Sequence, residues 1–211
     1  MKIMQLCLGM VATNCYIVYD ENTREAVVID PADNAPSILQ AAEREKLSIK
    51  YVLLTHAHFD HILAAHGVLE ATGAQYVVPE GDLWLLDRDN MGQFRSLARD
   101  YVQDVPDIVA NEGTQVTFGG LTATYMSTPG HTPGSSVIRI ENCLFTGDTL
   151  FRHECGRCDL EGGDFGQMLR SLKRLYDLAG DYQVLPGHDA LSTLHEERAE
   201  NPYMLQAAGK R

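Results

Sequence analysis

Three histidines and one aspartate lie within six positions of the chain, at His56, His58, Asp60 and His61. Imidazole nitrogens and carboxylate oxygens are ligands of zinc in proteins, and a catalytic zinc site keeps one position open for water. In extended chain His56 and His58 point to the same side, because side chains alternate with period two. These two residues can therefore hold one metal ion, while Asp60 and His61 can face a second. The alternative is a polar turn rich in histidine, which this density of ligands disfavours.

The segments on either side of this cluster predict how it is positioned. Tyr51 to Leu54 is a short apolar run typical of a buried strand, and the apolar spacing from Ile62 to Leu69 fits a helix. Asp60 lies near the start of that helix, where a carboxylate is favoured. The cluster therefore occupies a strand-to-helix turn, which is where ligands collect in α/β sheets.

Three further polar residues share this context. His131, Asp148 and His188 each follow a short apolar strand and lie in or beside a turn that contains glycine or proline. Glycine allows sharp bends and proline stiffens the loop, so such turns aim a side chain at a fixed point. Together with the first cluster they make five histidines and two aspartates. That set suffices for two metals with three terminal ligands each and one shared carboxylate.

The remaining pattern predicts a layered α/β fold, because strand and helix signals alternate. Strands are expected at residues 1–8, 14–19, 26–29, 51–54, 75–78, 114–118, 121–127, 136–140, 142–145 and 183–185. Helices are expected at residues 35–45, after Asp60, at 163–176 and in the tail at 193–204. Residues 79–103 predict one or two short helices, whose acidic side chains are expected to face solvent: Asp82, Asp87, Asp89 and Asp100.

Composition narrows the class of partner. The 211 residues include 29 acidic and 17 basic ones, a formal charge of −12, which argues against nucleic acid or an anionic membrane and leaves a small-molecule substrate. Five cysteines, an odd and low number, do not suggest a disulfide framework, so we expect a reducing cytoplasm. The apolar stretch from Ile3 to Ala12 is interpreted as a first strand rather than a signal peptide. No run is long enough to span a membrane, and nothing in the composition indicates an oligomeric state.

Two other features allow more than one interpretation. Asp30, at the end of the third strand, either hydrogen-bonds the loop that holds the histidines or is an ordinary turn former. Cys155 and Cys158 form a C-x-x-C motif, which can be a redox dithiol, half of a zinc site, or two ordinary thiols. Arg157, between them, is expected to pair with Asp159, with contact to an anionic substrate as the alternative.

Four motifs in chain order resemble the metallo-β-lactamase fold superfamily: THAHFDH (55–61), TPGHTPGS (128–135), FTGDTLF (145–151) and LPGHD (185–189). More narrowly, they resemble its glyoxalase II-like (hydroxyacylglutathione hydrolase-like) hydrolases, as do NCYIVYD (14–20), AVVIDP (26–31) and GRCDLEGGDF (156–165). The resemblance implies a four-layer αβ/βα sandwich with the site at one edge of two sheets. The two halves of the chain also look alike in outline, with strands first and then a strand–loop–helix that carries polar residues. We therefore expect a single domain over residues 1–211, made of two similar halves.

The resemblance also implies a ligand set. Carried onto this sequence, the first metal is bound by His56, His58 and His131, the second by Asp60, His61 and His188, and Asp148 bridges them. Two divalent ions are expected, zinc first, with iron or manganese as alternatives. Cysteine-bearing class B β-lactamases place a thiolate where Asp148 stands, so this residue disfavours their activity.

The implied function is hydrolysis of a small thioester or ester by a metal-bridging hydroxide, with Asp60 orienting the hydroxide and passing its proton to the leaving group. The chain ends soon after His188, with only about one helix of the region that supplies glutathione contacts in full-length glyoxalase II, so the sequence leaves glutathione recognition open. The alternatives are a mononuclear iron persulfide dioxygenase that uses mainly the first metal's ligands, a lactonase or β-lactamase, and an inactive metal-binding scaffold.

Overall fold

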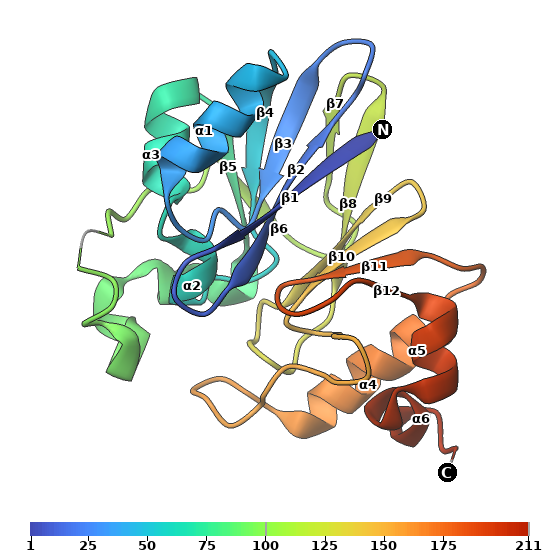
Figure 1. The fold of residues 1–211 in the computed structure, drawn as a ribbon. Helices are drawn as coiled ribbons and strands as arrows, with labels where there is room; N and C mark the ends of the chain where they lie inside the picture. The colour runs from blue at the N-terminus through green and yellow to red at the C-terminus, as the bar shows by residue number, and fades with distance from the viewer. Residues whose placement is uncertain (100, 211) are drawn as a thin grey trace.

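The strands form two six-stranded sheets in a computed structural model that describes residues 1–99 and 101–210 (Figure 1). The first sheet follows chain order: β1 (Lys2–Leu8), β2 (Thr13–Tyr19), β3 (Glu25–Ile29), β4 (Ser48–Leu53), β5 (Gln75–Pro79) and β6 (Ile108–Ala110). The second has the spatial order β12 (Ser192–Thr193), β11 (Gln183–Pro186), β10 (Cys143–Gly147), β9 (Ser136–Ile140), β8 (Leu121–Ser127) and β7 (Gln115–Phe118). Each half of the chain thus supplies one sheet.

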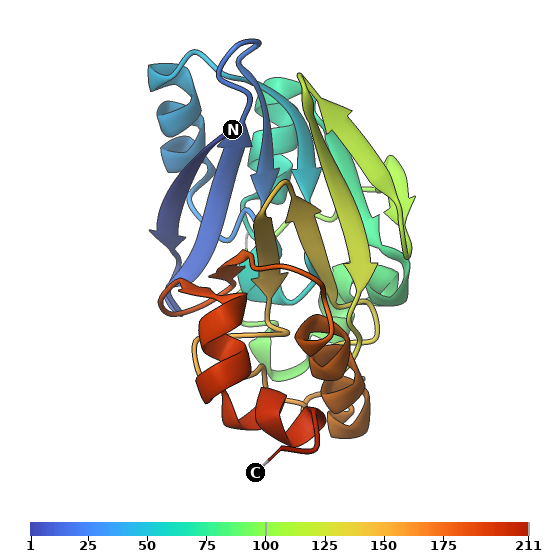
Figure 2. The ribbon, with the colours of Figure 1, turned by 90° about the vertical axis from the view of Figure 1, so that its right-hand side faces the viewer.

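Helices cover the outer face of each sheet (Figures 1 and 2). Helices α1 (Ala35–Arg44) and α3 (Ala65–Thr72) pack on the first sheet, and α2 (Phe59–Ile62) follows β4. Helices α4 (Phe165–Tyr176), α5 (Leu194–Glu200) and α6 (Pro202–Ala207) pack on the second, and two 3-10 helices, η1 (Glu80–Leu86) and η2 (Arg88–Phe94), follow β5. The predicted four-layer αβ/βα sandwich is confirmed. No helix in the described ranges has the length and apolar character needed to cross a bilayer.

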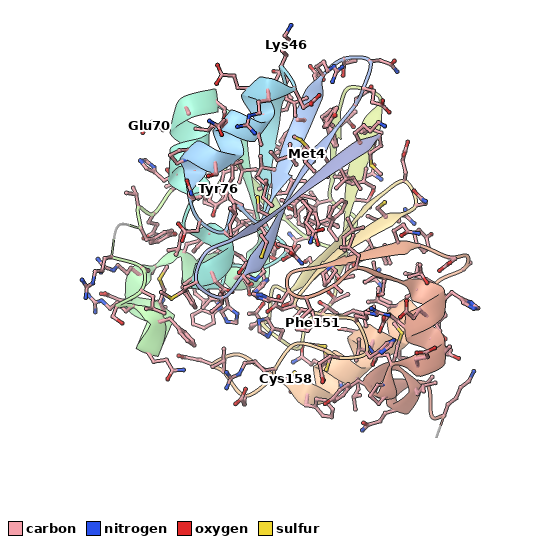
Figure 3. The ribbon with its side chains drawn as sticks, viewed as in Figure 1. Met4, Lys46, Glu70, Tyr76, Phe151 and Cys158 are labelled. Atoms are coloured by element: carbon pink, nitrogen blue, oxygen red, sulfur yellow. The ribbon has the colours of Figure 1, made fainter. Side chains whose placement is uncertain are left out.

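Apolar side chains fill three layers of core. Tyr16, Tyr125 and Phe145 belong to the layer between the sheets, and Met168 of α4 to the layer under the second set of helices. Tyr76 of β5 belongs to the layer beneath α1 and α3 (Figure 3). Because several strands are buried on both faces, their sequences are continuously apolar rather than alternating, which makes them firm supports for the loops that follow.

Parallel pairing brings the ends of distant strands to one edge. Strands β3, β4 and β5 are parallel neighbours, and so are β10 and β11. Parallel neighbours have their carboxyl ends at the same edge of a sheet. The segments after β4, β10 and β11 therefore leave the sheets on one side of the molecule.

Three differences from the sequence prediction have physical causes. Strands β6 and β12 were not predicted, because strands of three and two residues are too short to show an alternation of apolar and polar side chains. The predicted tail helix at 193–204 is two helices, since Asn201 ends α5 and caps α6, and Pro202 lacks the N–H that would continue the first. The helix after Asp60 is likewise divided, into α2 and α3, because Ala64 N donates to the Pro31 carbonyl oxygen at 2.9 Å instead of continuing the first helix.

The two sheets are tied together at the turn between β7 and β8. Asp20, after β2, accepts a hydrogen bond from Gly120 N at 2.6 Å, and Glu25, at the start of β3, accepts one from Gly119 N at 2.6 Å. The backbone donors lower the pKa of both carboxyl groups. The ionised carboxylates therefore hold the second sheet against the first.

We predict that this tie depends on pH. Because the pKa of folded Asp20 lies below its ordinary value of 3.8, its contribution is complete above that value and is lost as pH falls through the folded pKa. Asp20→Asn should lower the thermal midpoint near neutral pH, and the gap to the wild type should close in acid. The control is Glu21→Gln, which changes the exposed carboxylate next to Asp20 in the turn between β2 and β3. A gap that stays constant down to strong acid would contradict the assignment.

Candidate metal centre

The structure brings all seven predicted ligand side chains together where the edges of the two sheets meet: five line one cavity, and His56 and His61 are buried directly against those five. His56 and His58 lie in the loop after β4, with Asp60 and His61 in α2 directly behind them. The remaining three follow strands of the second sheet: His131 after β8, Asp148 after β10 and His188 after β11. Four side chains thus come from the first half of the chain and three from the second.

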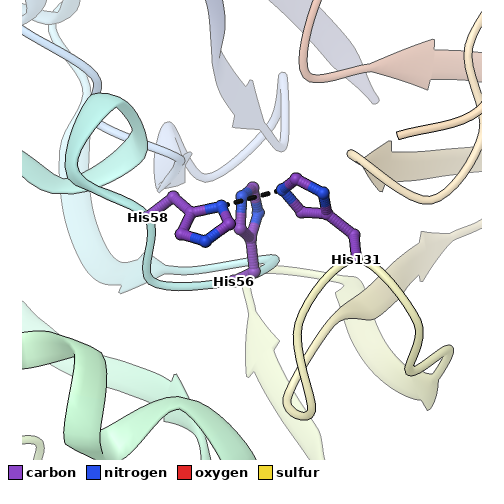
Figure 4. Close-up of side chains that lie close together, drawn as sticks. All are labelled: His56, His58 and His131. Atoms are coloured by element: carbon purple, nitrogen blue, oxygen red, sulfur yellow. Dashed lines mark hydrogen bonds between the residues drawn. The ribbon is translucent and has the colours of Figure 1, made fainter. Parts of the chain in front are cut away.

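His56, His58 and His131 form the first group (Figure 4). The ring centre of His56 lies 4.9 Å from that of His58 and 4.8 Å from that of His131. His58 Nδ1 and His131 Nε2 face each other at 2.8 Å. The prediction from strand alternation that His56 and His58 share a side agrees with this geometry.

Asp60, His61 and His188 form the second group. Asp60 Oδ2 lies 3.2 Å from His188 Nε2 and 3.7 Å from His61 Nε2. Asp148 lies between the groups: its Oδ1 is 3.4 Å from His61 Nε2, and its Oδ2 is 3.4 Å from His131 Nε2. One carboxylate therefore reaches both sets, as a bridging ligand must.

Unpaired buried atoms indicate that cations fit this arrangement. His56 Nε2, His61 Nε2 and Asp148 Oδ1 are buried without a hydrogen-bond partner. Such orphaned polar atoms are costly unless an ion or water satisfies them. The Nδ1 atoms of two of the histidines have partners of their own: His61 Nδ1 lies 3.0 Å from Asp30 Oδ2, and His131 Nδ1 lies 2.7 Å from the Arg157 carbonyl oxygen. These contacts orient the Nε2 lone pairs toward the cavity, and nitrogen and oxygen donors suit a divalent cation of borderline hardness.

Burial and neighbouring charge set the protonation of the group. Burial, assisted by His131, lowers the pKa of His58 to about 3, and burial, assisted by His61, lowers that of His56. Burial acts to raise the pKa of Asp148, but His61 outweighs it and the pKa is lowered. Burial also acts to lower the pKa values of His61 and His188, but Asp60 and Asp148 outweigh it, and these two pKa values are raised. His56 and His58 are therefore neutral and ready to bind a cation, whereas a cation at the second group must displace protons from His61 and His188.

Asp30 supports the histidine loop from behind. Its Oδ1 accepts a hydrogen bond from Thr55 N at 2.8 Å, and its Oδ2 accepts one from Thr55 Oγ1 at 2.7 Å. Thr55 Oγ1 in turn lies 3.1 Å from His56 Nδ1, and Asp30 Oδ2 contacts His61. These hydrogen bonds match the interpretation in which Asp30 orients the histidine loop. They connect Asp30 with His56 of the first group, through Thr55, and with His61 of the second.

Asp82 was predicted to face solvent, and that prediction was wrong. Its side chain is fully buried and accepts hydrogen bonds from Ala57 N at 3.0 Å, Thr132 Oγ1 at 2.7 Å and Gly134 N at 2.7 Å. Burial raises its pKa, and the three donors oppose that shift. Asp82 thus joins the loop of His56 and His58 to the loop of His131. Asp87 and Asp89 are exposed as predicted, and Asp100 lies outside the described residues.

Two residues of β2 position the second group and were not identified from the sequence. Thr13 Oγ1 donates to Asp60 Oδ2 at 3.2 Å, and Asn14 Nδ2 donates to the Pro186 carbonyl oxygen at 3.0 Å. Gly187 lies so close to Asp148 that a Cβ there would be 2.4 Å from Asp148 Oδ1. Asn14 opens the NCYIVYD motif, but no local pattern assigns a positioning role to Thr13 or Asn14, because their partners are distant in sequence.

The C-x-x-C motif lies beside the cavity without contributing to it. Both thiols are free, and neither belongs to a ligand group within the described ranges. Burial raises the pKa of Cys155 to about 12 and that of Cys158 to about 11, so both remain protonated near neutral pH. The structure thus favours two ordinary thiols. Arg157 pairs with Asp159 through two hydrogen bonds, at 2.7 and 2.8 Å, as expected.

The comparisons with known proteins agree with this geometry. A sequence model of the metallo-beta-lactamase superfamily matches residues 8–195. The hydroxyacylglutathione hydrolase GloC of Haemophilus influenzae is 29% identical over 203 residues, covering 90% of this chain and 92% of the relative. The human mitochondrial persulfide dioxygenase ETHE1 is 32% identical over 200 residues, covering 90% of this chain and 70% of the relative.

Solved structures show the same architecture. The B3 metallo-beta-lactamase BLEG-1 superposes with a TM-score of 0.88 at 34% identity, covering 96% of this chain and 99% of that chain. TTHA1623, solved in a di-iron-bound form, superposes with a TM-score of 0.84 at 32% identity, covering 95% of this chain and 99% of that chain.

We predict that Asp82→Ala destabilises the protein by about 3 kcal/mol, because three donors lose their acceptor and two are buried backbone amides. Urea denaturation of the metal-free protein measures this loss. Asp89→Ala, which removes an exposed carboxylate paired with Arg95, is the control and should cost less than about 1 kcal/mol. Equal losses in the two variants would refute the role given to Asp82.

Proposed function

Because this chain belongs to the metallo-beta-lactamase superfamily, we propose that it is a metal-dependent hydrolase that cleaves a small thioester or ester. The observation that carries the proposal is the convergence of seven ligand-type side chains with three buried, unpaired donor atoms. Three such atoms gathered within one set of ligand-type side chains are what bound cations would satisfy.

The ligand assignment follows the two groups. His56, His58 and His131 would hold one ion, Asp60, His61 and His188 the other, and Asp148 both. Two divalent ions there would supply an activated water at neutral pH and polarise a carbonyl oxygen. We propose zinc, with iron or manganese as alternatives, and note that TTHA1623 was solved in a di-iron-bound form.

Asp60 is the protein group proposed to move a proton. Its side chain is partly exposed to the cavity, whereas that of His61 is fully buried. Burial acts to raise the pKa of Asp60, but His61 and His188 outweigh it, so the pKa is lowered and the carboxylate stays ionised. The hydrogen bond from Thr13 Oγ1 fixes its orientation. Asp60 can therefore accept a proton from the attacking water and pass it to the leaving group. A thiol leaves readily, so a thioester needs no separate strong acid.

A persulfide dioxygenase is the second candidate, because ETHE1 carries that activity in its name and is 32% identical to this chain. We expect that reaction to need mainly the first group of ligands. The assembly of Asp60, His61 and His188 into a complete second group favours the hydrolase.

Metal content and a parallel substrate screen distinguish the two candidates. The purified protein is assayed for metal stoichiometry and offered S-lactoylglutathione, simple thioesters, lactones and glutathione persulfide. Two metals per chain with thioester or ester cleavage would support the hydrolase. One iron per chain with persulfide-dependent oxygen uptake would support the dioxygenase and overturn the hydrolase.

We predict that Asp148→Ala loses bound metal and hydrolysis together, because the shared carboxylate contacts both groups. Removing groups that merely orient ligands costs about 10–100-fold in affinity or activity, so removing this ligand should cost about 100-fold or more. Elemental analysis and initial rates measure the two effects. Asp177→Ala, at the far end of α4, is the control. A variant that keeps two metals and full activity would defeat the ligand assignment.

A further inference from the structure

A second chamber adjoins the metal cavity. The cavity lined by five of the seven ligand side chains has a volume of about 450 Å³, and the chamber beside it has a volume of about 310 Å³. The two share four lining residues: His58, Phe59, Phe94 and Leu160. His58 belongs to the first ligand group, so the chamber opens directly beside the reacting centre.

The walls of this chamber are mainly apolar. Trp84, Leu85 and Met91 come from η1 and η2, and the rings of Phe59 and Phe94 stack at 4.8 Å with an angle of 14°. Asn90 also lines it, but its side-chain amide is engaged by the Trp84 carbonyl oxygen at 2.7 Å. Small-molecule sites commonly have such a lining, with few polar groups beside it.

The charges at the chamber disfavour an anionic occupant. Asp159 and Glu161 line it, and none of its lining residues, all of which lie in the described ranges, is lysine or arginine. Arg157 lines the neighbouring cavity, but Asp159 already engages it through two hydrogen bonds. A carboxylate entering the chamber would meet the like charge of Glu161, an Asp159–Arg157 pair that is already neutral, and an apolar wall, so a neutral group is favoured.

The chamber is held in a fixed position relative to the ligands. Asp82 lies in η1, two residues before Trp84, and its carboxylate accepts from Ala57 N between His56 and His58. Trp84 Nε1 donates to the Gly81 carbonyl oxygen at 3.0 Å, which orients the indole. The apolar wall and the first ligand group are therefore parts of one hydrogen-bonded unit.

We propose that this chamber binds a neutral, apolar aliphatic or aromatic group of the substrate. The proposal rests on the proposed hydrolase function only in taking that group to be attached to a thioester or ester. The group belongs either to the acyl part or to the leaving thiol, and both share the same chemistry. Each methylene that enters the chamber should strengthen binding about fourfold until the chamber is full.

Binding can be measured without catalysis, because Trp84 is the single tryptophan of the chain and lines the chamber. Wild-type protein is titrated with neutral primary amides from acetamide to octanamide while tryptophan fluorescence is recorded. The dissociation constant should fall about fourfold per methylene over the first additions. A fluorescence response that is absent, or independent of chain length, overturns the proposal.

A matched pair of variants locates the site. Gln93→Phe places a ring at an exposed position on the chamber lining and should abolish the chain-length dependence while leaving the metal content unchanged. Gln206→Phe, an equivalent change at an exposed position of α6, should leave the titration unaltered. If both variants behave like the wild type, the apolar group binds elsewhere and the chamber is excluded.

Kinetics show whether the acyl part or the thiol part of the substrate enters the chamber, and they test the chamber proposal separately from the hydrolase proposal. In one series the acyl chain is lengthened on N-acetylcysteamine, and in the other the alkyl thiol is lengthened on an acetyl group. The series in which kcat/KM rises with length identifies the part that enters the chamber. If the amides bind with the expected chain-length dependence but no thioester or ester is cleaved, the hydrolase proposal is refuted and the proposal of an apolar binding site in the chamber stands. If the esters or thioesters are cleaved at rates independent of chain length, and Trp84 fluorescence does not respond to the amides, the chamber proposal is refuted and the hydrolase proposal stands.

Discussion

Two buried carboxylates hold the irregular loop on which the centre depends. The chain from Thr55 to His58 has no regular secondary structure, so its backbone N–H groups need partners from elsewhere. Asp30 accepts from Thr55 N and Asp82 from Ala57 N, on either side of His56. Burying a carboxylate is costly unless several donors compensate it. Asp30 and Asp82 each have three hydrogen-bonding partner atoms. Besides the loop, Asp30 contacts His61, and Asp82 contacts the loop that carries His131.

Neither half of the chain can assemble the centre alone. The first sheet and its loops contribute four of the ligand side chains, and the second contributes three, including the shared carboxylate of Asp148. Asn14 of β2 reaches across to the Pro186 carbonyl oxygen, and Asp82 reaches across to Thr132. The position of the cavity at the meeting edges of two sheets therefore follows from parallel pairing within each sheet and from side-chain hydrogen bonds between them.

The sequence predicted what short spacing and clear periodicity encode. The histidine cluster was recognisable because its residues are adjacent, and α1 and α4 because their apolar faces repeat. The burial of Asp82 was missed, since it is decided by Thr132 and Gly134, which lie 50 and 52 positions away. The same reason hid Thr13 and Asn14. The chamber lined by Trp84 and Met91 was also beyond local patterns, because η1 and η2 have no period long enough to show which side chains face inward.

The bond between Asn14 and Pro186 spans 172 positions and has a consequence for how the protein is made. A ribosome releases β2 long before β11, so the loop carrying His188 cannot dock until β11 has also been released. Pairings of such separation are slow to close, because the entropy of a long loop is lost before any contact is gained. Until then the ligand side chains of the first half lack the three that the second half supplies. The complete centre therefore forms only after β11 has left the ribosome and docked against β2.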